Sequence, residues 1–510
     1  MRWIKMVAIG IFATIGASAP ALAQKAKDTL RFPVPDPDAG IDTYLLPSSF
    51  NNVWGPSVYD MLLGFDAAKG QFVGQLAKGV TQPDPMTYDF ELRTDVKWHD
   101  GQAFDADDVV HTLTYLIDPK VNLRFKAYWA WIKSVEKLSA SKVRIHAHRA
   151  APDSLMYLAS RSPMYPEHLH GAVANKLDFA AKPIGTGPMR VVQLDQNTGI
   201  VAERNAGYVP SPVKQGSGVG RIVAAPIKDT GTLTATLLTG DADVAVDLPP
   251  DQAEDLQKSG RFDLTLVQRL GYSFIGFPSK GWEEAKPLAD IRVRTAIAKA
   301  IDRAAILKVK IGAMAQGQSP TEALCPKEQL GCGYTKLMPA YDPAGAKKLL
   351  AEAGYANGFD VTISCFPASA ADATAIAGML RAVGIRATIR QHPTAQRVQL
   401  INQGKIEIGY YGWSGGGMME VSGQLGRHVD SKEYDDPLLA KLTAATTTIM
   451  DDAKRRTEVA KVFDHITDNA YAFAIMQNYS FFTHTKDVEL NNPRAVRAEN
   501  VNPHEFRWKQ

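Results

Sequence analysis

Residues 412–416 read Gly-Trp-Ser-Gly-Gly, which matches the G-x-S-x-G pattern of serine hydrolases and makes Ser414 a candidate nucleophile. Possible triad partners follow in the chain order Ser, Asp, His: Asp430, Asp464, His465 and His484. The motif requires a helix directly after the serine and an HGGG-type oxyanion segment before it. Glycines at 415–417 and 423 interrupt such a helix, and no such segment precedes Ser414. We therefore keep a secreted serine hydrolase as the alternative and favour a flexible glycine loop at the edge of a cleft.

Two His-x-His pairs, at residues 146–148 and 168–170, could place two imidazoles on one face of a strand. Neither pair has the H-E-x-x-H spacing or a neighbouring carboxylate pattern typical of zinc sites. We expect surface histidines here, with no resident metal and no cofactor.

The elements that must position the 412–417 loop alternate between helix and strand. Asp342-Pro343 predicts a helix start and Gly354 its end, because Asp caps helices and glycine follows them. The pattern then predicts strands over 359–365, 385–389 and 406–411 and helices over 372–383 and 394–402. This is a doubly wound α/β layer with a parallel sheet, and the loop after Tyr411 faces the ligand crevice beyond the carboxyl ends of its strands.

Two further extended segments suggest connections between lobes. One is the apolar run 273–278, which ends at a proline before a helix that starts at Asp290, and the other spans residues 472–482. Two crossings of this kind are what two lobes joined by a hinge require.

Length and composition limit the class of protein. The chain has 510 residues, enough for about three domains, with 45% hydrophobic and 22% charged residues. Its net charge of +3 gives no electrostatic footprint for nucleic acid. Residues 1–23 combine a basic start, an apolar run and an Ala-Leu-Ala site before Gln24, which predicts a cleaved signal peptide and a periplasmic product.

Three cysteines fit an oxidising compartment. Cys325 and Cys332 share one short Pro/Gly-bounded loop, and we expect a disulfide between them, with two unpaired loop thiols as the alternative. Cys365 lies in an apolar strand segment and is expected to be buried.

Several phrases resemble the periplasmic solute-binding proteins of ABC importers, family 5, the peptide/nickel type. The most specific is LRTDVKWHDGQAF at 92–104, followed by DADDVV at 105–110. Others follow in the order of that family: GTGP at 185–188 with ERN at 203–205, GDAD at 240–243, DIRVR at 290–294 with AIDR at 300–303, and YDP at 341–343 with AEAGY at 351–355. Their residue types read mainly as turns and caps, with Asp105 or Asp107 starting a helix and His99 packed in a turn.

The resemblance implies an α/β, bilobal periplasmic-binding-protein fold of the large type, with a ligand cleft between two hinged lobes. We expect lobe one at 24–277, including an extra subdomain at about 61–184, lobe two at 278–478, and a C-terminal return to lobe one at 479–510. The implied function is the capture of a peptide or peptide-sized solute and its delivery to the permease subunits at the inner membrane. We expect a monomer that is not an enzyme.

The resemblance also suggests which side chains meet the solute. Aromatic residues fall where the family has its cleft: Trp54, Tyr410, Tyr411, Trp413 and Tyr479, with Phe50 and Trp282 nearby. Only one of the adjacent Tyr410 and Tyr411 can face the crevice. Peptide-binding members carry an Asp after the Gly-Trp of the loop and an Arg in the lobe-two segment, but 415–419 has no Asp and 366–378 no Arg. The expected ligand contacts are Trp54, Tyr411, Trp413, Ser414, Tyr479 and Glu420, the last as the nearest substitute acid, and a metal chelate stays open as a solute.

Overall fold

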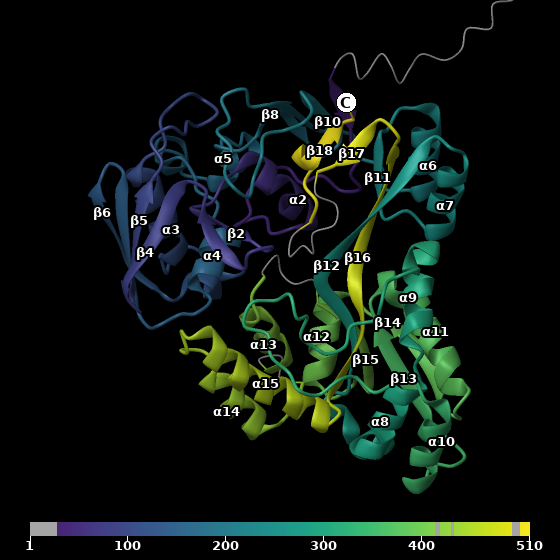
Figure 1. The fold of residues 1–510 in the computed structure, drawn as a ribbon. Coiled ribbons are helices and arrows are strands. Elements are labelled where there is room, and N and C mark those ends of the chain that lie inside the picture. Colours follow the sequence, from purple (N-terminus) through teal and green to yellow (C-terminus); the bar gives the residue numbers. More distant parts are fainter. Residues whose placement is uncertain (1–27, 414–418, 430–432, 492–499, 510) are drawn as a thin grey trace, which may run out of the picture.

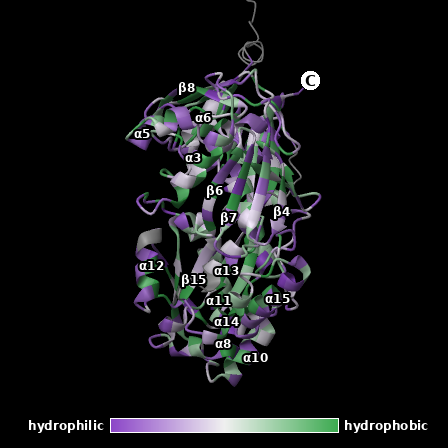
Figure 2. Cartoon of the chain, turned by 90° about the vertical axis from the view of Figure 1, so that its left-hand side faces the viewer, coloured by the Kyte–Doolittle hydropathy of each residue, from purple (hydrophilic) through white to green (hydrophobic). Residues whose placement is uncertain are grey.

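The computed structural model describes residues 28–413, 419–429, 433–491 and 500–509. Buried apolar side chains form two large cores, which define two lobes stacked one above the other (Figure 1 and Figure 2). We call residues 28–270 with 481–509 the first lobe and residues 272–476 the second lobe. The signal peptide expected at 1–23 and Ser414 lie outside the described residues.

The first lobe is built from small sheets. One sheet has the order β1 (Thr29–Arg31), β10 (Arg221–Ala224), β9 (Gly199–Arg204) and β8 (Met189–Asp195). A second has the order β4 (Ala77–Asp84), β5 (Thr87–Leu92), β7 (Lys142–Ala147) and β6 (Ile132–Ser139). Two hairpin-like pairs complete the lobe: β2 (Leu63–Asp66) with β3 (Gln71–Gly74), and β17 (Val488–Leu490) with β18 (Phe506–Trp508). The second of these pairs is made by the end of the chain.

Helices of the first lobe cover these sheets. They are α2 (Ser49–Val58), α3 (Ala106–Ile117), α4 (Ser154–Ser160), α5 (Lys176–Ala181), α6 (Thr230–Thr239) and α7 (Pro250–Lys258). Of the two predicted caps, Asp105 and Asp107, it is Asp105 that caps α3, and it forms a capping box with Asp108. A small third core lies between α6, α7 and the long strands described next.

One six-stranded sheet runs through both lobes, in the order β11 (Val244–Val246), β16 (Ala472–Thr485), β12 (Phe262–Gly276), β15 (Ile408–Trp413), β13 (Asp360–Cys365) and β14 (Arg386–Gln391). The long strands β12 and β16 pair antiparallel along their whole length and are the two connections between the lobes (Figure 1). Their register shifts between Arg269 and Tyr272, opposite Asn478 and Gln477. The extended crossings are therefore paired strands rather than separate linkers.

The lobes divide earlier in the chain than the sequence suggests. Leu270 packs in the first core, whereas Tyr272, Phe274 and Phe277 pack in the second. The sequence places this boundary after residue 277. The difference arises because β12 continues past the register shift and pairs with β15 inside the second lobe.

The second lobe contains the predicted helix–strand alternation. Its helices are α8 (Ile291–Ala300), α9 (Arg303–Ile311), α10 (Pro343–Glu352), α11 (Ala370–Arg381), α12 (Thr394–Asn402), α13 (Ser422–Val429), α14 (Pro437–Ala445) and α15 (Asp452–Asp468). Asp342 caps α10 by accepting a hydrogen bond from the Gly345 N–H, 2.8 Å away. Strands β13, β14 and β15 are parallel, as predicted.

Two expectations about this sheet need correction. The sheet is mixed rather than wholly parallel, because β12 pairs antiparallel with β15. The loop expected to begin at Gly412 begins later, since β15 continues through Trp413 and pairs this residue with Tyr272. Within the described stretches, no helix combines the length and apolar character that crossing a bilayer requires.

Candidate functional site

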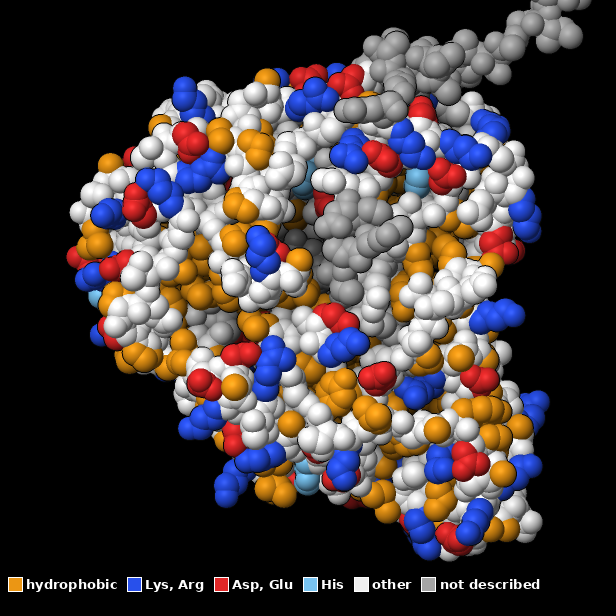
Figure 3. All heavy atoms as spheres, in the orientation of Figure 1, with side chains coloured by type: hydrophobic (Ala, Val, Ile, Leu, Met, Phe, Trp, Pro, Cys, Tyr) orange, Lys and Arg blue, Asp and Glu red, His pale blue; other side chains and the backbone are white. Residues whose placement is uncertain are grey.

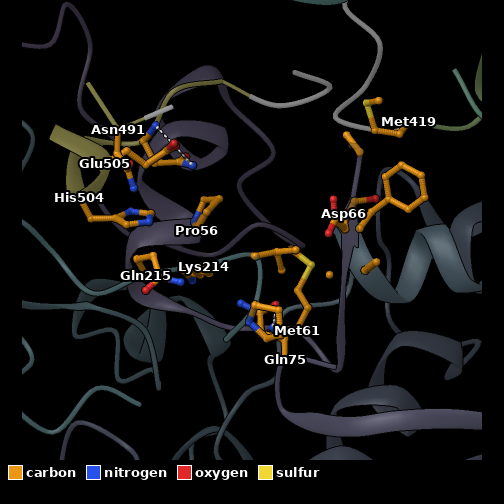
Figure 4. A pocket seen from close by; sticks show the side chains of 18 of the residues that line it. Pro56, Met61, Asp66, Gln75, Lys214, Gln215, Met419, Asn491, His504 and Glu505 are labelled. Atoms are coloured by element: carbon orange, nitrogen blue, oxygen red, sulfur yellow. Dashed lines mark hydrogen bonds between the residues drawn. The ribbon is translucent and has the colours of Figure 1, made fainter. Parts of the chain in front are cut away.

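A cavity of about 540 Å³ lies where the first lobe meets the segment that follows β15 (Figure 4). Most of its wall comes from the first lobe, from α2, β2, α4, a loop at 212–216 and the C-terminal stretch 500–505. Met419 of the second lobe completes it and packs with the first core. On the face shown in Figure 3, hydrophobic side chains gather where the two lobes approach each other.

The polar groups of this cavity are fixed by partners in the wall. Lys214 Nζ lies 2.6 Å from Asp60 Oδ1 and donates to the Tyr59 carbonyl at 2.8 Å. Gln75 Nε2 donates to the same Asp60 oxygen at 2.8 Å. A rigid wall of mixed apolar and polar character is typical of a site that holds a small organic molecule.

Trp413 is the last residue of β15 and lies beside β12, where it pairs with Tyr272. Its ring centroid is 5.7 Å from that of Tyr272, and its carbonyl accepts a hydrogen bond from Asn478 Nδ2 at 3.1 Å. Tyr272 belongs to β12 and Asn478 to β16, so Trp413 contacts both strands that connect the lobes. The exposed fraction of Trp413 is 8%, and we therefore place this residue at the rim of the second core.

Tyr411 and Tyr479 lie on different strands of this sheet, Tyr411 opposite Phe274 and Tyr479 opposite Gln268. Tyr411 packs edge-on against Phe274, with ring centroids 5.7 Å apart, and is buried. Tyr479 is partly exposed on β16, and its hydroxyl lies 3.4 Å from Gln318 Oε1. The structure thus brings three of the predicted aromatic residues, Tyr411, Trp413 and Tyr479, to the sheet that joins the lobes.

Trp54 is placed differently from the sequence-based expectation. The sequence suggests a position at the cleft, but the Trp54 side chain is fully buried in the first core. It lies on the inner face of α2, 6.1 Å from the Phe50 ring, because residues 50, 54 and 58 share that face. The geometry favours a structural role for Trp54.

Glu420 is also committed to partners inside its own lobe. Its carboxylate forms an ion pair with Arg455 and accepts a hydrogen bond from the Ser422 N–H at 2.7 Å. Only 1% of Glu420 is exposed, and this burial raises its pKa while Arg455 opposes the rise. An amine of a solute would have to displace Arg455, so the geometry favours a structural ion pair.

Arg397 is a residue of this region that the sequence analysis missed. Its guanidinium lies over the Tyr411 ring, 4.6 Å from the centroid, and 5.4 Å from that of Phe366. Arg397 sits in the first turns of α12, directly after the carboxyl end of β14. Arg397 lies near the start of the helix predicted over 394–402, which follows a predicted strand. Its position at the ligand edge of the sheet is the sequence feature that could have identified it.

Three of the candidate triad partners of Ser414 are engaged elsewhere, and the fourth, Asp430, lies outside the described residues. His465 Nε2 lies 2.7 Å from Asp436 Oδ2, and His484 Nε2 lies 2.9 Å from the Thr265 hydroxyl. Asp464 accepts hydrogen bonds from the backbone N–H and the hydroxyl of Thr335. The hydrolase alternative is therefore unsupported. Among the described residues, no three His, Cys, Asp or Glu side chains are grouped in a way that could hold a metal ion.

Comparisons with known proteins agree with this architecture. Residues 71–435 match the profile of the bacterial extracellular solute-binding proteins, family 5 (middle region). The chain is 29% identical over 433 residues to the glutathione-binding protein GsiB of Pectobacterium atrosepticum, covering 81% of this chain and 78% of that relative. The periplasmic binding protein DppA of Helicobacter pylori in complex with the peptide STSA superposes with a TM-score of 0.72 at 20% identity, covering 96% of this chain and 100% of DppA.

A metal-chelate binder has the same fold. NikA of Brucella suis in complex with Fe(III)-EDTA superposes with a TM-score of 0.78 at 19% identity, covering 94% of this chain and 100% of NikA. These structures confirm the bilobal periplasmic-binding-protein fold that the sequence predicts.

Proposed function

The chain belongs to the bacterial extracellular solute-binding proteins, family 5, and from this membership we propose that it captures a peptide-sized solute between its lobes for an ABC permease. The observation that carries the proposal is the junction itself. Strands β12 and β16 connect the lobes, Trp413 contacts both of them, and Met419 of the second lobe lines a cavity whose other lining residues belong to the first lobe. When a site lies at a hinge, the movement of the lobes closes it over the solute, and the reverse movement opens it for release.

We propose that Trp413 and Tyr479 supply the aromatic contacts to the solute, whereas Tyr411, which is 1% exposed, supports the sheet from inside the second core. Rings at the rim of a core offer large apolar faces, which suit stacking or a cation. Ser414 follows Trp413 directly and is proposed as a neighbouring polar contact. Trp54 and Glu420 support the site from within their lobes instead.

The size of the solute is inferred from relatives of different specificity. GsiB is named for glutathione, the Helicobacter DppA holds a four-residue peptide and the Brucella NikA holds Fe(III)-EDTA. All three are compact molecules with several polar groups, and a cavity of about 540 Å³ accommodates a molecule of that size. The protein would act in the periplasm as a monomer after removal of residues 1–23, and the solute would leave it chemically unchanged.

Mass spectrometry of small molecules that copurify with the protein from its native periplasm tests this function. We expect one dominant peptide-sized solute, which is released on denaturation and rebinds the emptied protein in a calorimeter with unchanged mass. Glutathione and the dipeptide Met-Leu serve as defined probes in the same calorimeter. A protein that releases no solute and binds none of the probes, or that returns a cleaved product, would contradict the proposal.

A further inference from the structure

Arg149 makes a polar contact that joins the two lobes away from the strands that connect them. Its Nη1 donates to the Thr447 carbonyl of the second lobe at 3.1 Å and to the Ala150 carbonyl of its own lobe at 3.1 Å. Arg149 follows β7 in the first lobe, and Thr447 follows α14 in the second lobe, 298 residues further along the chain. In Figure 1, α14 lies below β4 and α4, across the boundary between the lobes.

The two ends of this contact suit a bond that forms and breaks. Thr447 directly follows Thr446, the C-cap of α14, and the end of a helix favours a cation because its last carbonyl groups carry a partial negative charge. Arg149 is exposed, and it keeps the Ala150 carbonyl as a partner when the lobes separate. Separation of the lobes therefore leaves no buried charge without a partner at this position.

The contact lies on the same side of the molecule as the cavity. On the first lobe, Arg149 shortly precedes α4, which supplies part of the cavity wall. On the second lobe, α14 packs against α13, which closely follows the cavity residue Met419. Burial raises the pKa of Glu420 against the effect of Arg455, and the nearby charge of Asp153, directly before α4, adds to the rise. The start of α4 therefore faces the segment that follows Met419.

We propose that the contact between Arg149 and the Thr447 carbonyl is a latch, which forms when the lobes close beside the cavity and breaks when they open. The inference rests on the proposed function, because a latch affects binding only if the solute is held between the lobes. Arg149 is absent from the described residues that line the cavity, so it acts as a positioning residue. A contact made only by the closed lobes raises the population of the closed state, and the apparent affinity follows that population.

Pulsed electron paramagnetic resonance measures the separation of the lobes directly. Spin labels at Lys133→Cys on β6 and Lys441→Cys on α14 report it, because both positions are exposed. We expect a shorter and a longer distance in the solute-free protein, and Arg149→Gln should lower the ratio of the short to the long population by about threefold. Arg149→Lys keeps a cationic donor and should retain part of the ratio. The exposed Arg381→Gln on α11 is the matched control and should leave the ratio unchanged.

Stopped-flow binding of glutathione and Met-Leu gives a second readout. In Arg149→Gln, each probe that binds should dissociate about threefold faster and associate at a nearly unchanged rate, because the latch forms only after the solute has entered. Thermal unfolding of the solute-free protein should be the same in Arg149→Gln and Arg381→Gln, since both arginines are exposed. A lower unfolding temperature in Arg149→Gln with unchanged distances would instead assign Arg149 a structural role.

The outcomes separate the latch from the function. Identical distance distributions in the wild type and Arg149→Gln, with and without a probe, overturn the latch while solute binding stands. A change in the association rate alone also overturns it, since Arg149 would then act in the encounter with the solute rather than in closure. If neither probe binds and no solute copurifies, the proposed function fails, and the solute-free distances still decide whether the latch exists.

Discussion

At the scale of single residues, the junction depends on side chains that contact several elements at once. The Trp413 ring lies tilted against that of Tyr272 of β12, and its carbonyl accepts a hydrogen bond from Asn478 of β16. A solute held against the Trp413 ring would therefore be linked, through this one residue, to both strands that connect the lobes. This makes Trp413 the most informative single position in the proposed site.

Replacement of Trp413 tests the aromatic contact. We expect Trp413→Ala to weaken solute binding by about tenfold or more, since loss of a desolvated ring contact costs on the order of 1.4 kcal/mol. Trp413→Phe keeps a ring and should retain most of the affinity. Calorimetry with the copurified solute measures both, and thermal unfolding of the solute-free variants separates lost contacts from lost stability. Unchanged affinity in Trp413→Ala would remove this residue from the site.

His99 illustrates a residue whose role is to hold two loops together. Its Nδ1 accepts a hydrogen bond from the Gly185 N–H at 3.2 Å, so the neutral ring donates from Nε2 to the Gly187 carbonyl at 2.9 Å. Both glycines lie directly against the backbone of Val58, where a Cβ would clash. The sequence correctly places His99 in a packed turn.

The pH dependence of stability follows from this environment. Burial lowers the pKa of His99 from 6.5 to about 4, although the Gly187 carbonyl favours the protonated ring. Because the folded pKa lies below the unfolded one, the stabilisation is complete above pH 6.5 and is lost as the pH falls toward 4. We expect this residue to account for about 2–3 kcal/mol of the loss. Urea unfolding at several pH values should show a shallower slope in His99→Gln, and an unchanged slope would count against the assignment.

At the scale of elements, a disulfide loop holds the segment that leaves the proposed site. The structure joins Cys325 and Cys332, with Cα atoms 5.8 Å apart. Within this loop, the Leu330 N–H donates to the Met419 carbonyl at 2.6 Å and the Leu330 carbonyl accepts from the Val421 N–H at 3.1 Å. Met419 lines the cavity and Leu330 packs against the first core. The disulfide loop therefore connects the second lobe to the wall of the cavity.

Removal of the disulfide should affect stability and binding together. The chain-entropy model assigns about 2–3 kcal/mol to a loop this short, so Cys325→Ser/Cys332→Ser should unfold at a lower temperature. We also expect weaker solute binding, because Met419 loses its support. Cys365→Ser is the control, since that cysteine is free and lies in β13 away from the loop. Thiol counting under denaturing, non-reducing conditions should find one thiol in the wild type, and three would exclude the disulfide.

At the scale of the whole molecule, β12 and β16 determine how the lobes can move. Their pairing continues across the junction, and it is irregular only near Arg269–Tyr272 and Ser273–Phe274. A bulge of this kind bends a strand pair locally without separating it. We place the hinge at the first of these irregularities, opposite Gln477 and Asn478.

Small-angle X-ray scattering tests the closure of the lobes. Addition of saturating copurified solute to the emptied protein should reduce the radius of gyration, because a hinged pair of lobes closes over its ligand. Trp413→Ala at the same solute concentration should remain closer to the solute-free value. A radius of gyration that does not change when calorimetry shows full occupancy would contradict a hinged importer component.

The sequence alone determined the local elements and the family. The caps at Asp290 and Asp342, the helix–strand alternation of 343–413 and the phrase at 92–104 are encoded within short stretches, because capping and periodicity depend on neighbours in the chain. The same information placed the segment after Tyr411, with Trp413, at one edge of a sheet. It also predicted two crossings between lobes.

Only the tertiary structure decided which side chains are free to act. From the sequence, Glu420 is a candidate for binding an amine, but in the structure it pairs with Arg455, 35 residues away in the chain. Trp54 is a candidate cleft residue in the sequence, but α2 directs its side chain into the first core. The extension of β15 to Trp413 and the ion pair between Arg397 and Glu433 likewise depend on partners distant in the chain. Desolvation and long-range pairing are properties of the packed molecule, and no local pattern of residues specifies them.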